Sequence, residues 1–330
     1  MNTADVAGDD PDRSPGKSVI VRWSLDELPA VLAELGLERP FLVASPRWSL
    51  DVPVVGRWSE VPSDRVEAAP GADSLLAVGG GSAIDAAKNV SAQTGLPLVS
   101  VPTTYSGAEW TPGFGIRSPD RRMVGGGGGA NLAAIVYDAG LTLGLPREAT
   151  VGTAMNALAH CAEALYVRGR NDAGDRRALE GAALIAEWLP AVVERPEDRG
   201  ARTMLLRGAA AGGEALALAG LGIAHAMAQA LGGRYGLPHG TMNAICLPPG
   251  LEFAAAESPE AVGRFEQALG QATVEELAAL GGFGRLGALG VPEDELPAVA
   301  VAAARRHGNQ NMPRPASPVE IEQLLRSIYR

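Results

Sequence analysis

The spacing of the apolar residues changes near residue 147, and this change divides the chain into two halves. Before it, short apolar runs at residues 41–44, 75–78, 98–101 and 134–137 are typical of buried strands, and weaker candidates occupy residues 18–23, 52–55 and 58–61. Helix-like segments separate several of them, for example Leu25 to Leu35, which Ser24 would cap and Gly36 would end. This alternation predicts a doubly wound, Rossmann-like parallel sheet in a dinucleotide-binding domain over residues 17–147.

Strand signals nearly vanish after Pro146. Residues 149–167, 172–193, 202–219, 221–231 and 240–255 carry helical apolar patterns, and shorter ones continue to residue 329. Residues 148–330 are therefore predicted to form an all-helical catalytic domain, with the active site in the cleft between the two domains. Residues 1–16 contain four aspartates and no apolar run, so we expect a disordered tail rather than a signal peptide.

Three glycines and a serine, Gly79, Gly80, Gly81 and Ser82, join the predicted strand 75–78 to a predicted helix. Such a turn leaves backbone N–H groups at the helix start, and these donors suit a phosphate. Glycine allows the close approach, and Ser82 could cap the helix. The spacing is not G-x-G-x-x-G, and a tight turn without a ligand is the alternative interpretation.

Two further polar segments follow predicted strands. Ser45 comes after residues 41–44, and Thr103 and Thr104 come after residues 98–101. Ligands of open parallel sheets bind at the carboxyl ends of the strands, so we expect both segments beside the glycine turn. By contrast, the five consecutive glycines at residues 125–129 predict a flexible surface loop.

Composition narrows the range of partners. The formal net charge of −10 argues against nucleic acid or an anionic membrane. Hydrophobic residues make up 46% of the chain, but no uninterrupted apolar stretch is long enough for a transmembrane helix. Two cysteines imply no disulfide framework, so a cytoplasmic protein is expected.

Three of the four histidines, His160, His225 and His239, lie in apolar context in the helical half. Asn156 and Gln229 stand four residues from His160 and His225, on the same helix faces. Three imidazoles and an oxygen ligand could hold a divalent metal, but a neutral amide at Asn156 weakens that interpretation. Ordinary buried histidines are the alternative.

These segments also carry a family resemblance. The chain resembles the iron-containing alcohol dehydrogenase superfamily, which is related to dehydroquinate synthase and the glycerol dehydrogenases. The matching motifs, in chain order, are Gly79-Gly80-Gly81-Ser82 with Asp85 and Lys88, Pro102-Thr103-Thr104 with Gly107 and Glu109, Tyr137-Asp138, Asn156-Ala157-Leu158-Ala159-His160, His225 to Gly232, and Leu237-Pro238-His239-Gly240. Residues 102–112, 141–146, 155–157 and 312–315 are most similar to the maleylacetate reductase branch.

The resemblance implies NAD(P)H-dependent reduction of maleylacetate to 3-oxoadipate in aromatic-ring degradation, by a homodimer. Metal-binding members have aspartate where this chain has Asn156; the reductase branch has asparagine and works without metal, so no metal is expected. The implied cofactor-binding residues are Ser45, Gly79, Gly80, Gly81, Ser82, Asp85, Thr103, Thr104 and Ser106, and the implied catalytic residues are His160, His225, His239 and Tyr105. Ser45 selects neither cofactor, whereas Arg47 favours tolerance of NADPH.

The chain departs from the branch at Gln229, where most relatives have a histidine, at residues 242–244, which lack a further histidine, and in the glycine-rich segment 121–131. One alternative is a metal-dependent alcohol dehydrogenase that binds Zn²⁺ or Fe²⁺ through Asn156 and the three histidines. Another is a repurposed biosynthetic or non-redox nucleotide-binding member. A dicarboxylate substrate would need cationic anchors, for which Arg117 and Arg314 are the candidates.

Overall fold

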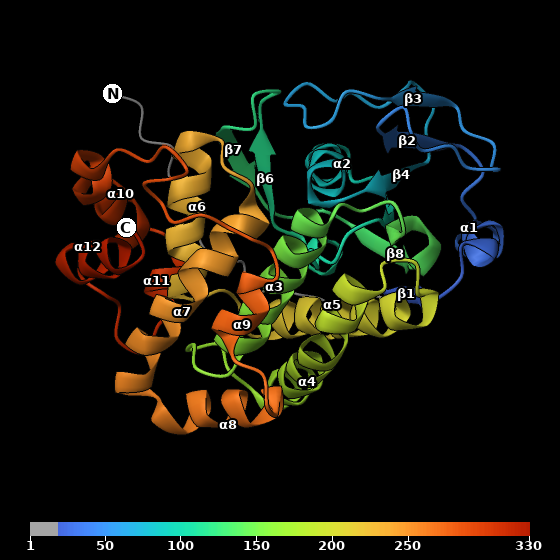
Figure 1. Cartoon of the computed structure of the whole chain (residues 1–330). Helices are drawn as coiled ribbons and strands as arrows, with labels where there is room; N and C mark the ends of the chain where they lie inside the picture. The colour runs from blue at the N-terminus through green and yellow to red at the C-terminus, as the bar shows by residue number, and fades with distance from the viewer. Residues whose placement is uncertain (1–18) are drawn as a thin grey trace.

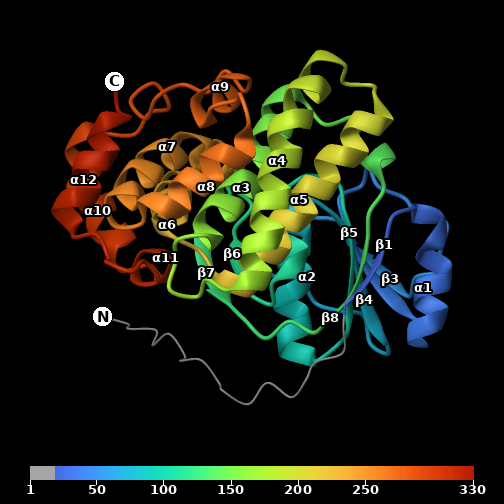
Figure 2. The same ribbon diagram turned by 90° about the horizontal axis from the view of Figure 1, so that it is seen from below.

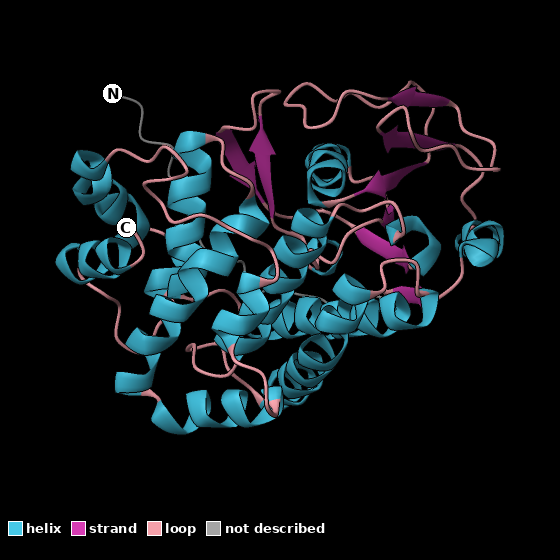
Figure 3. Cartoon of the chain, in the orientation of Figure 1, coloured by secondary structure: helices cyan, strands magenta, loops and turns pink. Residues whose placement is uncertain are grey.

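Six parallel strands form the sheet of the N-terminal half (Figures 1 and 3). The computed structural model describes residues 19–330, so the tail expected at residues 1–16 lies outside the described residues. The strand order is β1-β8-β5-β4-β2-β3, which leaves β1 and β3 at the edges. The strands are β1 Ile20–Arg22, β2 Pro40–Ala44, β3 Gly56–Trp58, β4 Ser74–Gly79, β5 Leu98–Pro102 and β8 Leu132–Val136.

Helices cover both faces of this sheet. On one face, Leu42 and Ala44 of β2 pack with α1 (Leu28–Leu35), and on the other, Phe41 and Val43 pack with α2 (Gly81–Thr94). Burial on both faces explains why these strands read as continuous apolar runs. The predicted limits of the first helix are confirmed: Ser24 caps a 3₁₀ turn, η1 (Leu25–Glu27), and Gly36 ends α1 at φ 67°.

Helices make up the rest of the chain, as the sequence predicts (Figure 2). They pack around one large apolar cluster that also takes in Ile135 and Tyr137 at the end of the sheet. The elements are η3 Ala139–Thr142, α3 Arg147–Ala164, α4 Asp172–Glu194, α5 Arg199–Ala219, α6 Ile223–Tyr235, α7 His239–Glu257, α8 Pro259–Leu269, α9 Val274–Ala279, η4 Glu293–Glu295, α10 Leu296–Ala304, α11 His307–Gln310 and α12 Pro318–Ser327.

Among the described helices, none is by itself both long and apolar enough to cross a membrane. The adjoining α5 and α6, bent by 102°, reach that length and composition only when they are taken together.

A small hairpin corrects the prediction of a flexible glycine loop. Strand β6 (Phe114–Arg117) pairs antiparallel with β7 (Met123–Gly127), so three of the five glycines lie in a strand. A Cβ on Gly127 would come within 2.9 Å of the Phe114 ring, and one on Gly126 within 3.0 Å of the Phe114 carbonyl oxygen. Close packing, rather than freedom of motion, explains these glycines. Residues 52–61 likewise contain β3 instead of the two predicted segments.

Candidate active site

Three polar segments meet at the carboxyl ends of neighbouring strands. Ala44 of β2 pairs with Val78 of β4, and Gly79 of β4 pairs with Pro102 of β5. Ser45, the glycine turn and the loop that follows β5 therefore lie side by side, as expected from the sequence.

The glycine turn is closely fitted to that loop. Gly79 has φ 156°, which favours glycine, and a Cβ on Gly80 would come within 2.9 Å of Thr104 Cγ2. Helix α2 begins at Gly81 with Gly80 as its N-cap and no side-chain cap, so the expectation that Ser82 caps the helix is wrong. The Ala83 amide donates to the Gly80 carbonyl oxygen at 3.0 Å, so the amides of Gly81 and Ser82 are the ones left without a partner within the helix.

Hydroxyl groups without partners line the loop after β5. Thr103 Oγ1, Thr104 Oγ1 and Ser106 Oγ are buried and have no hydrogen-bond partner. The Cβ position of Gly81 lies 3.6 Å from Ser106 Oγ, which places that hydroxyl next to the start of α2. Buried polar atoms are normally paired, so this group fits a polar ligand such as a dinucleotide held at the helix start.

Asp85, expected at the cofactor, instead bonds within the protein. Its Oδ1 accepts from Lys88 Nζ at 3.3 Å and its Oδ2 from the backbone N–H of Gly115 at 3.3 Å. Lys88, only 1% exposed, also donates to the carbonyl oxygens of Ala108 and Gly113, the latter at 2.9 Å. This pair fastens α2 to β6 and to the short turn η2 (Ala108–Trp110).

The three predicted histidines come together from three helices. His160 of α3 stacks on His225 of α6 with ring centroids 4.6 Å apart. His239, the first residue of α7, lies 5.7 Å from His225, centroid to centroid. Asn156, one turn before His160, donates from Nδ2 to the Ser106 carbonyl oxygen at 2.7 Å, and so joins the cluster to the loop after β5.

That bond to Ser106 fixes the proton positions in the cluster, because a carbonyl oxygen only accepts. The Asn156 amide must therefore turn its Oδ1 toward His225 Nε2, at 3.2 Å, and toward Asn243 Nδ2, at 2.7 Å. The other hydrogen of Asn243 Nδ2 faces both the His239 carbonyl oxygen, at 3.2 Å, and His239 Nε2, at 3.1 Å. Because an amide nitrogen cannot accept, His239 Nε2 is assigned as an acceptor, and Nδ1 then carries the hydrogen. Nδ1 of His239 is buried and has no partner, which makes it a free donor.

Glu163, which was not among the predicted site residues, completes the cluster. It is fully buried, its Oε2 lies 2.6 Å from His225 Nδ1, and its Oε1 accepts from the His225 backbone N–H at 3.0 Å. A glutamate three residues after His160 in an otherwise apolar stretch was the signal in the sequence.

Burial keeps the rings of His160 and His239 neutral. Loss of hydration, with repulsion from His225 and His239, holds the pKa of His160 well below its usual value. Loss of hydration, with His225, Arg117 and Arg306 nearby, lowers the pKa of His239 to about 3. Near neutral pH both rings are therefore uncharged, and neutral imidazole N–H groups are good partners for a developing oxyanion.

Tyr105 is not brought to this cluster. It is fully buried, and its hydroxyl donates to Thr142 Oγ1 and accepts from Arg202 Nη1, both at 3.1 Å. On α5, the residue nearest to the cluster is Gly213, because Gly107 packs between Gly213 and His160. Arg202 lies eleven residues before Gly213 on the same helix. That separation is about 16 Å along the helix. The placement gives no support to the expected catalytic role of Tyr105.

The two arginines expected to anchor a dicarboxylate differ. Arg314 is bound by Glu257 at 2.7 Å and Glu320 at 2.8 Å, away from the histidines. Arg117 is half-buried and close enough to lower the pKa of His239. A third arginine, Arg306, was not predicted from the sequence. Its Nη1 donates a long hydrogen bond of 3.5 Å to Gln229 Oε1 of α6.

The donor set does not fit a metal ion as it is arranged. Asn156 Oδ1 already faces two donors, and both ring nitrogens of His225 have partners. In the part of the chain that the structure describes, no three His, Cys, Asp or Glu side chains are grouped to hold a metal. Metal binding would require these bonds to break.

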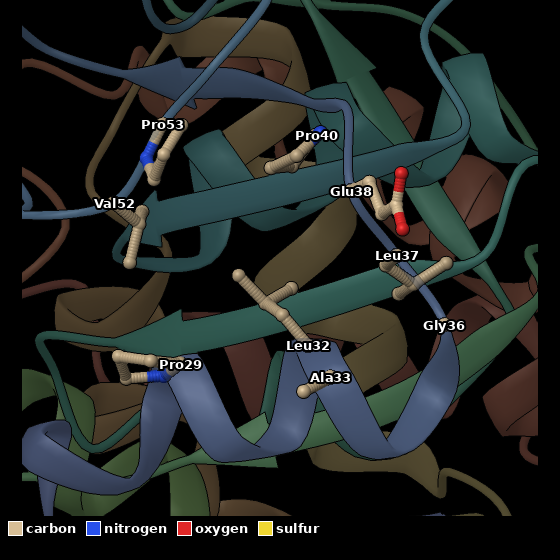
Figure 4. A pocket seen from close by; sticks show the side chains of 9 residues that line it. All are labelled: Pro29, Leu32, Ala33, Gly36, Leu37, Glu38, Pro40, Val52 and Pro53. Carbon is tan, nitrogen blue, oxygen red and sulfur yellow. The ribbon is translucent and has the colours of Figure 1, made fainter.

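Two surface hollows lie elsewhere. The first is bordered by Leu32 and Ala33 of α1 and by Pro40, at the amino end of β2 and thus opposite to Ser45 (Figure 4). The second lies at the turn between α7 and α8. Neither includes a histidine of the cluster, which is found where the loop after β5 meets α3, α6 and α7.

Comparisons with known proteins agree with this arrangement. Residues 64–137 match the family model described as "Iron-containing alcohol dehydrogenase", and residues 150–329 match "Fe-containing alcohol dehydrogenase family, C-terminal". A maleylacetate reductase of Burkholderia cepacia is 33% identical over 290 residues, which cover 86% of this chain and 81% of that protein. One of Rhizobium sp. (strain MTP-10005) is 35% identical over 277 residues, covering 82% and 78%.

Among solved structures, the crystal structure of maleylacetate reductase from Agrobacterium tumefaciens superposes with a TM-score of 0.82 at 29% identity. The superposition covers 97% of this chain and 98% of that one. The similarity therefore extends over both halves, including the strand ends and the helices that carry the histidines.

Proposed function

The chain belongs to the iron-containing alcohol dehydrogenase family, and on this premise we propose that it transfers a hydride from NADH or NADPH to an unsaturated oxo acid of the maleylacetate type. Family membership makes it an oxidoreductase acting on a small molecule. The relatives called maleylacetate reductase support the substrate class, and 3-oxoadipate would be the product.

The observation that carries the proposal is the set of unpartnered donors at one junction. The free Nδ1–H of His239 and the hydroxyls of Thr103, Thr104 and Ser106 are buried and unsatisfied. Asn156 joins the two groups through the Ser106 carbonyl. Such groups persist in a folded protein where a ligand satisfies them. Here they suit a cofactor on one side and a carbonyl substrate on the other.

The cofactor would be held by the amides at the start of α2 and by the three hydroxyls, with Ser45 at the adjacent strand end. When bound, its dihydronicotinamide supplies the hydride. Hydride addition to a carbon–carbon double bond conjugated with a carbonyl places negative charge on the carbonyl oxygen. The neutral N–H of His239 would donate to that oxygen, and preorganised donors of this kind stabilise the transition state. The enolate carbon would take its proton from water, which His160 or His239 would orient, because neither neutral ring has a proton of its own to give.

The same hydrogen bonds support a reaction without metal. Asn156 Oδ1 is occupied as an acceptor, and the Glu163–His225 bond fixes the orientation of the His225 ring. A metal-dependent alcohol dehydrogenase is the second candidate, which the description of the matched family favours. In that case the amide and imidazole groups would have to release their present partners.

Turnover after chelation tests the proposal. We expect chelator-treated protein to oxidise NADH or NADPH rapidly when maleylacetate is added, and metal analysis to show no stoichiometric metal. Activity that is lost on chelation and restored by Zn²⁺ or Fe²⁺ would favour the second candidate. Binding of cofactor without turnover of maleylacetate would contradict the proposed reaction, and a lack of turnover of alcohols after addition of Zn²⁺ or Fe²⁺ would contradict the second candidate.

Gly81 tests the cofactor assignment separately. A Cβ there would have its nearest contacts at 3.6 Å, so Gly81→Val should keep the fold. It would stand among the amides at the helix start, and we expect the Kd for NAD(P)H to rise about 10- to 100-fold. Gly80→Val is a poorer test because its Cβ would press on Thr104. An unchanged Kd for Gly81→Val would remove the phosphate assignment.

A further inference from the structure

Two half-buried arginines lie beside the histidine cluster without acidic partners. Arg117 is the last residue of β6, and Arg306 immediately precedes α11. Within residues 19–330 neither forms a salt bridge under 4.0 Å, whereas Arg314 is held by two glutamates. Charged groups taken out of water are normally paired, so two partly buried arginines without carboxylate partners call for a physical reason.

The β6–β7 hairpin and α6 bring the two arginines to one place. Figure 1 shows this hairpin between α2 and α6. Arg117 is paired in register with Met123 of β7. A Cβ on Gly233 of α6 would lie 3.1 Å from Met123 Cβ and 3.7 Å from Arg306 Nη2. Gly233 thus leaves room for the hairpin and the arginine side chain to approach the same point on α6.

Arg306 has few acceptors where it lies. Its Nη1 donates to Gln229 Oε1 over 3.5 Å, the limit for a hydrogen bond, and its Nε is buried without any partner. Arg117 donates to the carbonyl oxygen of Arg121 at 3.2 Å. Both guanidinium groups therefore keep donors available, and a guanidinium offers five in a planar fork that matches a carboxylate.

The two positive charges also act on each other and on the site. Loss of hydration and the charge of Arg117 lower the pKa of Arg306. Both arginines help to lower the pKa of His239. The carboxylate of Asp85 attracts Arg117, but its oxygens are already bonded to Lys88 and to the Gly115 amide. Asp85 therefore offsets part of the charge of Arg117 only, and no carboxylate among the described residues is placed to offset Arg306, beside a histidine that we place in the reaction.

We propose that Arg117 and Arg306, with Gln229 supporting Arg306, form a subsite for a carboxylate of the substrate and so select a dicarboxylate. This inference rests on the proposed function only where it names the substrate of the reaction; binding of a dicarboxylate by the two arginines does not depend on it. It assigns Gln229 a purpose: an amide oxygen can accept from Arg306, whereas a protonated histidine there would add a third positive charge.

Binding of adipate, a stable six-carbon dicarboxylate, tests this subsite directly. Titration calorimetry on the full chain saturated with NADH or NADPH would compare adipate with hexanoate, which has one carboxylate. We expect tighter binding of adipate, and a loss of about tenfold or more in Arg306→Met and in Arg117→Met. Arg306→Lys should retain part of the affinity. Arg305→Met is the matched control, because Arg305 is exposed, and should bind adipate as the parent does.

The other outcomes separate the possible errors. Unchanged adipate affinity in both methionine variants would overturn the subsite. An equal loss of NAD(P)H affinity in them would show that the arginines bind a cofactor phosphate, which also overturns it. Adipate selectivity without turnover of maleylacetate would refute the proposed reaction and keep the subsite. Turnover of maleylacetate with an unchanged KM in Arg306→Met would refute the subsite and keep the proposed reaction. Melting temperatures should not fall in Arg306→Met, because the removed charge has no partner.

Discussion

The loop after β5 contributes to two buried polar clusters that differ in how their atoms are partnered. Tyr105 joins Thr142 and Arg202, where each polar side chain has a hydrogen bond at 3.1 Å or less. Ser106, its neighbour in the chain, is joined through Asn156 to the histidine cluster, and there the hydroxyls of Thr104 and Ser106 and the Nδ1 atoms of His160 and His239 are buried without partners. The first arrangement stabilises the contact between the halves, and the second keeps donors free for ligands.

The comparison predicts that changes in the histidine cluster act on catalysis. In His239→Phe the ring shape is largely kept, but the free Nδ1–H is lost. We expect kcat with maleylacetate to fall about 10²- to 10³-fold, as when one oxyanion donor is removed. Nδ1 has no partner in the protein, and Asn243 Nδ2, which faces Nε2, keeps Asn156 Oδ1 and the His239 carbonyl oxygen as acceptors. Stability should therefore change little, which thermal unfolding would check. A kcat close to that of the parent would refute the assigned donor.

Changes in the partnered cluster should act on stability. Arg202 is 1% exposed and donates to the Pro196 carbonyl at 2.6 Å as well as to Tyr105. Arg202→Met leaves the buried Tyr105 hydroxyl without this donor and removes the bond to the exposed Pro196, so we expect a loss of about 1–3 kcal/mol in the free energy of unfolding. Urea denaturation would measure it. For the protein that remains folded, kcat should stay near that of the parent; a large fall in kcat at normal stability would break the comparison.

The two clusters should also respond differently to acid. The pKa of His239 is lowered to about 3, against about 6.5 in an unfolded chain, and that of His160 is lowered too. Below pH 6.5 the unfolded chain therefore binds more protons than the native protein, and stability falls as the pH falls. Between pH 6 and 4, His239→Phe should reduce this slope by up to about 1.4 kcal/mol per pH unit. Arg202→Met should leave the slope unchanged, and an equal slope in all three proteins would contradict the neutral histidine.

Much of the fold could be predicted because each pattern had one physical meaning. Continuous apolar runs such as residues 41–44 imply strands buried on both faces, and Gly36 implies a helix end. The glycines of β7 were wrongly predicted to form a flexible loop. The need for glycine there comes from Phe114, which packs against these residues only in the folded hairpin. The expectation for Ser82 was wrong because Gly80 takes the N-cap position, two residues before Ser82.

The site was predicted in part for a similar reason. His160 and Asn156 share a helix face, so their spacing alone placed them together, and the family resemblance added His225 and His239. Arg306 could not be found in this way because its neighbours, Gln229 and Gly233, are more than seventy residues away. The catalytic role expected for Tyr105 gains no support from its contacts, because sequence position gives the loop but not the direction of one side chain within it.

The finest test of the comparison removes one oxygen atom. Tyr105→Phe keeps the buried ring and deletes the hydroxyl that bonds Thr142 and Arg202. Thr142 still donates to the Ala139 carbonyl and Arg202 to Pro196, so we expect a loss of only about 1 kcal/mol in the free energy of unfolding. The kcat should remain within about twofold, because donors that stabilise the oxyanion are worth far more. A fall of tenfold or more, measured with NADH and maleylacetate at unchanged stability, would return Tyr105 to the catalytic set and show that the two clusters act as one.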